Sequence, residues 1–167
     1  MQLAERTRWL ALAVLVGCAP AAAPPPAPRP PAPPATPRRV TPLAGVPDYV
    51  VQYLPAHGIY VDIGGEEGSE TIALDRETGR LRVRLAHEGR PPAISERALP
   101  RREVDRLWSL AEAAWREPPP PAHERVLDFD ELLAMRDGND AFYLDGGGKI
   151  TPPAAAELVE AMAKAAR

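Results

Sequence analysis

The residue types that most often do chemistry in proteins are sparse in this 167-residue chain. Cys18 is the only cysteine, which excludes an internal disulfide, a CxxC redox pair and a cysteine-based metal cluster. The histidines His57, His87 and His123 lie far apart, so no HExxH or His-x-His metal pair exists locally. No GxSxG motif is present either. The sequence therefore predicts no metal site, no cofactor and no enzyme.

Three serines and one carboxylate pair remain as conceivable catalytic groups. None of Ser69, Ser95 and Ser109 has a base close to it in the sequence. Asp128 and Asp130 share a strand face at i, i+2 spacing and would couple their titration if buried, but a solvated sheet edge explains them better. A hydrolase that assembles separate histidines and carboxylates by folding stays open as an alternative.

Two loops contain residues typical of ligand loops but lack the required spacing. An EF-hand reading of the acidic turn at Asp137 fails, because Ala141, Phe142 and Gly148 stand at its fifth, sixth and twelfth positions. The glycine run 146–148 lacks the upstream glycine and the hydroxyl after the lysine that a phosphate loop needs. Both segments are predicted to be turns.

Alternating apolar residues predict the strands that must position these groups. Short β-rich runs occupy 49–54 and 58–63, and a hairpin joins 70–74 to 80–85 through a turn at 75–79. In the second arm Leu81, Val83 and Leu85 alternate with Arg80, Arg82 and Arg84. The three arginines therefore share one face. They could bind a polyanion, but we favour a solvated face balanced by Glu70 and neighbouring acids.

A helix is predicted from Pro100 to about Arg116, with prolines 118–121 ending it. Its apolar stripe consists of Val104, Leu107, Trp108, Ala111, Ala114 and Trp115, and we expect its two tryptophans to be core residues.

A second strand pair, 126–136 and 141–144, precedes a final helix that Thr151 caps, with Pro152 in or near its first turn. The buried stripe of this helix is predicted to be Ala155, Leu158, Val159, Met162 and Ala166. This order predicts an α+β domain, an antiparallel sheet of four or five strands covered by two helices.

The N-terminal residues predict where the protein is located in the cell. Arg6 and Arg8 precede the apolar run Trp9–Val16, which is far too short to span a bilayer and matches a secretory signal. The tetrapeptide Leu15-Val16-Gly17-Cys18 that ends the signal resembles the lipobox of bacterial lipoproteins.

The lipoprotein resemblance implies cleavage between Gly17 and Cys18, a diacylglycerol on the Cys18 sulfur and usually an acylated amino terminus. Two or three acyl chains hold a protein stably on a membrane. In a two-membrane bacterium Ala19, where an aspartate would signal inner-membrane retention, favours the outer membrane. The alternative is an ordinary secretory signal with a chance cysteine.

Twelve of the 22 prolines fall between Pro20 and Pro47, which predicts a disordered Pro/Ala-rich linker. Fully extended at ~3.1 Å per residue, it would reach about 90 Å. We interpret it as a stalk in which Arg29, Arg38 and Arg39 are free to meet anionic polymers, although a PxxP ligand is an alternative. The chain thus divides into a signal peptide (1–17), a lipidated cysteine with linker (18–47) and a small domain (48–167).

The domain is acidic, because residues 1–47 carry +4 and leave −7 of the formal charge of −3 for the rest. Its cationic side chains alternate with acidic ones, so we expect no nucleic-acid partner.

A resemblance in layout suggests one further function class. The Gly64-Gly65 pair near the first strands, the helix ending in Ala113-Ala114-Trp115, the segment from Asp128 to Gly138 and the last amphipathic helix are similar in layout to emfourins, small bacterial metalloprotease inhibitors. The resemblance implies an envelope protease inhibitor but carries over no inhibitory residue.

The leading hypothesis is a lipid-anchored envelope protein that presents a non-catalytic binding or accessory domain to a protein or peptidoglycan partner. The envelope protease inhibitor and a hydrolase with an unrecognised site are the alternatives.

Overall fold

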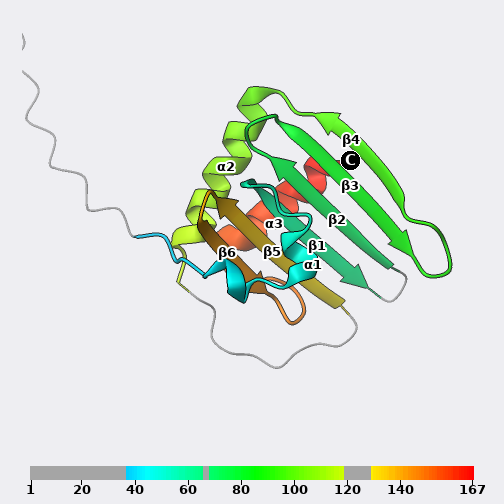
Figure 1. Cartoon of the computed structure of the whole chain (residues 1–167), viewed down its shortest axis with the longest axis horizontal. Helices are drawn as coiled ribbons and strands as arrows, with labels where there is room; N and C mark the ends of the chain where they lie inside the picture. The colour runs from blue at the N-terminus through cyan, green and yellow to red at the C-terminus, as the bar shows by residue number, and fades with distance from the viewer. Residues whose placement is uncertain (1–36, 66–67, 119–128) are drawn as a thin grey trace, which may run out of the picture. The chain divides into compact units, whose positions relative to one another are not determined.

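Six antiparallel strands form one sheet in the part of the chain that the computed structural model describes, residues 37–65, 68–118 and 129–167 (Figure 1). The spatial order is β4-β3-β2-β1-β5-β6. The strands are β1 (His57–Gly65), β2 (Gly68–Asp75), β3 (Arg80–His87), β4 (Ala93–Ala98), β5 (Phe129–Asp137) and β6 (Asp140–Asp145). The predicted α+β class with an antiparallel sheet is confirmed.

The predicted number of four or five strands was too low, because the sequence pattern missed β4. All six residues of β4 are exposed, so the strand shows no alternation of buried and solvated positions. It pairs with β3 alone, at the edge of the sheet, and follows Pro91 and Pro92. A strand that buries neither face gives no periodic signal.

Two helices, α2 (Arg101–Arg116) and α3 (Pro153–Ala166), cover one face of the sheet. All six residues predicted for the α2 stripe are buried, including Trp108 and Trp115. The two indole rings meet edge to face, with their centroids 6.5 Å apart. In α3 the last buried residue is Ala165 rather than the predicted Ala166.

The start of α3 differs from the prediction, because Pro152 is its N-cap and makes no side-chain capping bond. The carboxylate of Glu117, at the end of α2, instead accepts hydrogen bonds of 3.1 Å from the backbone N–H groups of Ala154 and Ala155. The predicted cap at Thr151 was therefore wrong. The donors of α3 are satisfied from another element, which spacing within the sequence could not reveal.

The opposite face is covered by the segment that precedes β1. It contains a 3-10 turn, η1 (Leu43–Gly45), and a short helix, α1 (Asp48–Val51), where the sequence predicted a strand from Tyr49 to Leu54. Pro47 begins this helix, and Val50 and Leu54 share its buried side at i, i+4 spacing. With Val46 they pack on residues of β1, β2, β5 and β6, namely Tyr60, Ala73, Leu132, Ala134 and Ala141.

The packed region begins about ten residues before Asp48, where the sequence placed the start of the domain. The backbone N–H of Arg39 donates to Trp115 O at 3.0 Å, and that of Thr41 donates to Ala141 O at 2.7 Å. Val46 is only 4% exposed. Residues 38–47 are thus part of the fold, and the described chain belongs to a unit that begins at Ala35.

Candidate functional site

The sheet face opposite α2 and α3 is only partly covered, and its β2–β4 region carries the candidate site. In the register, Arg82 lies between Ala73 on β2 and Glu96 on β4. One pair further along, Arg84 lies between Thr71 and Ile94. Because directly paired residues of antiparallel strands point to the same face, these side chains form two adjacent rows across the sheet.

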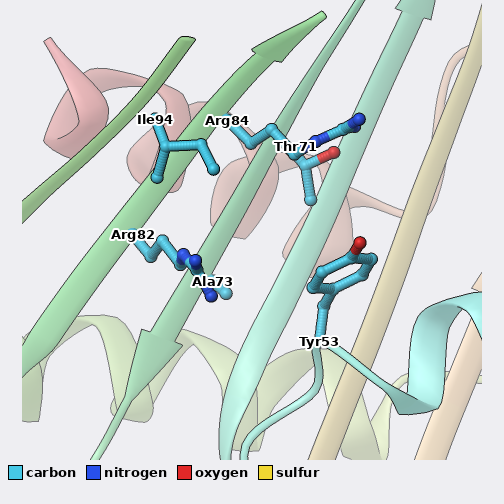
Figure 2. A pocket seen from close by; sticks show the side chains of 6 residues that line it. All are labelled: Tyr53, Thr71, Ala73, Arg82, Arg84 and Ile94. Carbon is cyan, nitrogen blue, oxygen red and sulfur yellow. The ribbon is translucent and has the colours of Figure 1, made fainter. Parts of the chain in front are cut away.

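A hollow of about 150 Å³ lies between these rows and the end of the covering segment. Figure 2 shows Tyr53 on one side of the hollow and Ile94 on the other, with Arg84 extending from β3 toward Thr71. Tyr53 and Ile94 are 42% and 53% exposed, so each presents a large apolar side chain to solvent beside the hollow. The residues that line the hollow are Tyr53, Thr71, Ala73, Arg82, Arg84 and Ile94.

The arginines of this face differ in their ion pairs. Glu96 binds both Arg80, at 3.7 Å, and Arg82, at 3.3 Å. Within the described part of the chain, Arg84 makes no hydrogen bond and no ion pair, although the charge of Asp62 on β1 attracts it. Arg84 is half-buried and borders the hollow.

The sequence was right that the three arginines share a face, but wrong that Glu70 balances them. Glu70 pairs with Leu85 and therefore points to the helix-covered face. The acids that do balance them are Glu96 on β4 and Asp62 on β1, two strands that flank the predicted hairpin on either side. Their proximity depends on strand order, which the hairpin sequence does not contain.

Asp62 is a half-buried carboxylate beside the hollow. Its oxygens accept hydrogen bonds of 3.4 Å from the hydroxyls of Tyr60 and Thr71. Burial raises the pKa of Asp62, and these hydrogen bonds and the charge of Arg84 oppose that rise. Burial and the charge of Asp62 also raise the pKa of the Tyr60 phenol. Because Thr71 donates to Asp62, its hydroxyl hydrogen is already used within the sheet.

A second cluster joins the start of β1 to the end of β5. Nδ1 of His57 lies 2.9 Å from Oδ1 of Asp137, the geometry of an imidazole held by a carboxylate. Arg38 donates to the other oxygen of Asp137 at 3.0 Å. The hydrogen bond from His57, followed by that from Arg38, lowers the pKa of Asp137 despite its partial burial.

Arg38 also binds Glu112 on α2 through two of its nitrogens, and its guanidinium carbon lies 4.7 Å from the Trp115 ring centroid. The guanidinium of Arg39 lies 4.5 Å from the centroid of the Phe142 ring. The expectation that Arg38 and Arg39 are free to meet anionic polymers was therefore wrong. Both side chains stack on rings of the domain.

The outer side of His57 borders a pocket of about 170 Å³ that Arg76, Glu77 and Arg101 complete. Nε2 of His57 lies 3.7 Å from a carboxylate oxygen of Glu77. An imidazole that a carboxylate orients through Nδ1 can accept a proton at Nε2. Among the described residues, His57 is hydrogen-bonded to no hydroxyl that could serve as a nucleophile.

The structure does not bring the other candidates to this cluster. Ser69 lies on β2, Ser95 on exposed β4, and Ser109 donates its hydroxyl to the backbone oxygen of Asp105 within α2. His87 ends β3. The remaining candidates, Gly17, Cys18, Arg29, His123 and Asp128, lie outside the described residues.

The glycine run 146–148, which lacks the spacing of a phosphate loop, makes structural contacts with β5. Asp130 is exposed and accepts from the Gly148 N–H at 3.3 Å. The buried carboxylate of Glu131 accepts from the N–H of Ile150 at 2.7 Å, and its backbone bonds both Gly146 and Gly148. The glycine loop therefore wraps around Glu131 and leads the chain into α3.

Two features are absent from the described ranges. No group of three or more histidine, cysteine, aspartate or glutamate side chains there is arranged to hold a metal ion. None of the helices described has the length and apolar character needed to cross a bilayer.

Comparison with known proteins adds no relative: no family model, no curated protein and no solved structure matches this chain. The resemblances to lipoproteins and emfourins therefore stay predictions.

Tyr53 and Ile94 were not predicted as site residues. Ile94 lies between Pro91-Pro92-Ala93 and the polar residues Ser95 and Glu96, which gives no alternating pattern, and Tyr53 lies in the segment 49–54 that was predicted to be a strand. The one signal for this site was the arginine alternation on β3.

Proposed function

We propose that this protein is a lipid-anchored cell-envelope protein whose domain is a non-catalytic binding module. The observation that supports a binding module best is the partly covered face of the sheet, where Tyr53 and Ile94 flank the hollow beside Arg84. Large exposed apolar side chains beside an arginine that has no ion pair with any described residue favour a binding surface. A cleaved signal peptide, lipidated Cys18 and a Pro/Ala-rich linker would carry this domain, and the outer membrane is the expected site in a two-membrane bacterium.

The anchor is tested by its processing. Cys18→Ala should leave an unprocessed precursor and abolish fatty-acid labelling, because the thiol that receives the diacylglycerol is gone. Gly17→Ala keeps a small residue before the cysteine and should be processed like the natural chain. Normal processing and labelling of Cys18→Ala would contradict the anchor.

The binding module is tested by crosslinking in the native envelope. Ile94→Asp should remove the crosslinked partner, because it puts a charge at the rim of the hollow. Tyr49→Asp is the matched control, since Tyr49 is a similarly exposed apolar residue that does not line the hollow. Identical crosslinks in both variants and the natural chain would place the binding surface elsewhere.

The hydrolase alternative rests on His57 and Asp137, whose geometry could activate a water molecule. The natural chain and His57→Ala would be compared on chromogenic carboxylic and phosphoric esters. Turnover that His57→Ala abolishes would support a hydrolase, and equal rates for the two proteins would exclude this site as catalytic.

A further inference from the structure

Arg84 lines the hollow and makes no hydrogen bond or ion pair with any described residue, although the charge of Asp62 attracts it. A guanidinium presents up to five N–H donors in a planar fork that matches a carboxylate. Asp62, the acid that attracts Arg84, already accepts hydrogen bonds from Tyr60 and Thr71. Because no described residue accepts a hydrogen bond from Arg84, which lines the hollow, its donors are open to a ligand there.

The surroundings of Arg84 favour a monovalent group with an apolar neighbour over a polyanion. Arg80 and Arg82 are both bound to Glu96, so the face does not offer three free cations. The remaining lining includes the Ala73 methyl, the Ile94 side chain and the Tyr53 ring. Phosphate-rich ligands need several unpaired donors and gain little from such a lining.

We propose that the hollow between Tyr53 and Ile94 binds the free carboxyl terminus of a peptide that ends in a small apolar residue. Arg84 binds the terminal carboxylate, and the last side chain packs against Ala73 and Ile94. The Tyr53 ring closes the side of the hollow next to the covering segment (Figure 2). This inference rests on the proposed binding function and names its ligand class.

The test measures fluorescence anisotropy of a dye-labelled peptide ending in Ala-Ala, with the full chain in detergent. The peptide with a free carboxylate should bind at least tenfold more tightly than the same peptide with a terminal amide, because only the carboxylate pairs with Arg84. Equal affinity of acid and amide, or no binding of the acid, would overturn the proposal.

Arg84→Gln should weaken binding of the acid peptide at least tenfold. Arg80→Gln is the matched control, because Arg80 lies on the same strand and face but does not line the hollow, and it should change affinity less than twofold. Equal losses in both variants would show nonspecific charge attraction and contradict a site at Arg84.

A second variant keeps the test decisive if Arg84→Gln does not fold. Ile94→Ser changes an exposed residue and should leave thermal unfolding unchanged while weakening the acid peptide several-fold. Unchanged affinity would show that the hollow is not used. All these measurements are made in solution, so their failure leaves the lipidation of Cys18 untouched, and failed lipidation would leave this site untouched.

Discussion

At the scale of single residues, Arg38 connects the segment before the sheet to both layers of the domain. It binds Glu112 on α2 and Asp137 on β5 and stacks on Trp115. Arg38→Ala removes a charged hydrogen-bond donor from two half-buried carboxylates, so we expect the free energy of unfolding to fall by about 2 kcal/mol. Denaturant unfolding measures the loss. Arg80→Ala, which breaks only a surface pair, should cost less than about 0.5 kcal/mol, and similar losses in the two variants would contradict this role.

The same cluster makes stability depend on pH. Asp137 has a lowered pKa, mainly through His57, and Arg38 lowers the pKa of Glu112 against the effect of burial. A carboxylate whose pKa is lower in the folded state stabilises the fold above its unfolded pKa of about 4 and loses that contribution as pH falls. We therefore expect the free energy of unfolding to drop between about pH 5 and pH 2. Asp137→Asn should flatten this drop in denaturant titrations, and a parallel curve would contradict the prediction.

Much of the site chemistry could not be predicted from sequence because partners lie far apart. His57 and Asp137 are 80 positions apart, and Arg38 and Asp137 are 99 apart. They meet because β1 and β5 pair antiparallel with His57 opposite Asp137, a register that no local pattern encodes. The arginine face, in contrast, follows from alternation within one strand, which is why the sequence revealed it.

Among the elements, α2 and α3 were predictable because each carries an apolar stripe with helical period. The β2–β3 hairpin was predictable because its turn contains residues that favour a tight turn. Asp75 accepts hydrogen bonds of 2.9 Å from the N–H groups of Glu77 and Thr78, and Gly79 adopts a φ of 68°. The covering helix α1 was not predictable, because its four residues are β-rich and its burial depends on the sheet beneath. Local propensity yields to such tertiary packing.

The carboxylate of Glu117, at the end of α2, caps the start of α3. Glu117→Ala removes the acceptor for two N–H groups of α3, so we expect a loss of about 1 kcal/mol and faster hydrogen exchange in its first turn. Glu160→Ala, an exposed glutamate within α3, is the control and should leave that turn protected. Equal exchange rates in both variants would mean that Glu117 does not cap α3.

In the whole molecule, the domain begins earlier than the sequence predicted. Residues 38–47 read as proline-rich linker in the sequence, yet they contribute the Arg38 cluster, the Thr41 pairing with β6 and buried Val46. Composition could not reveal this, because prolines restrict the backbone conformation of a segment but do not determine whether that segment packs on the domain. The predicted linker therefore ends before Arg38, and Tyr53, which follows α1, lines the hollow.

Two truncated chains test this boundary. Residues 48–167 lack the ion pairs of Arg38 and the burial of Val46, so we expect them to unfold with about 3 to 5 kcal/mol less free energy than residues 35–167. Without residues 38–47, Leu132 and Ala141 lose part of their cover, so the shorter chain should also bind hydrophobic dyes more strongly. Urea unfolding of both chains measures the difference. Equal midpoints and slopes would mean that the fold begins at Asp48 and that the contacts of the preceding segment contribute no stability.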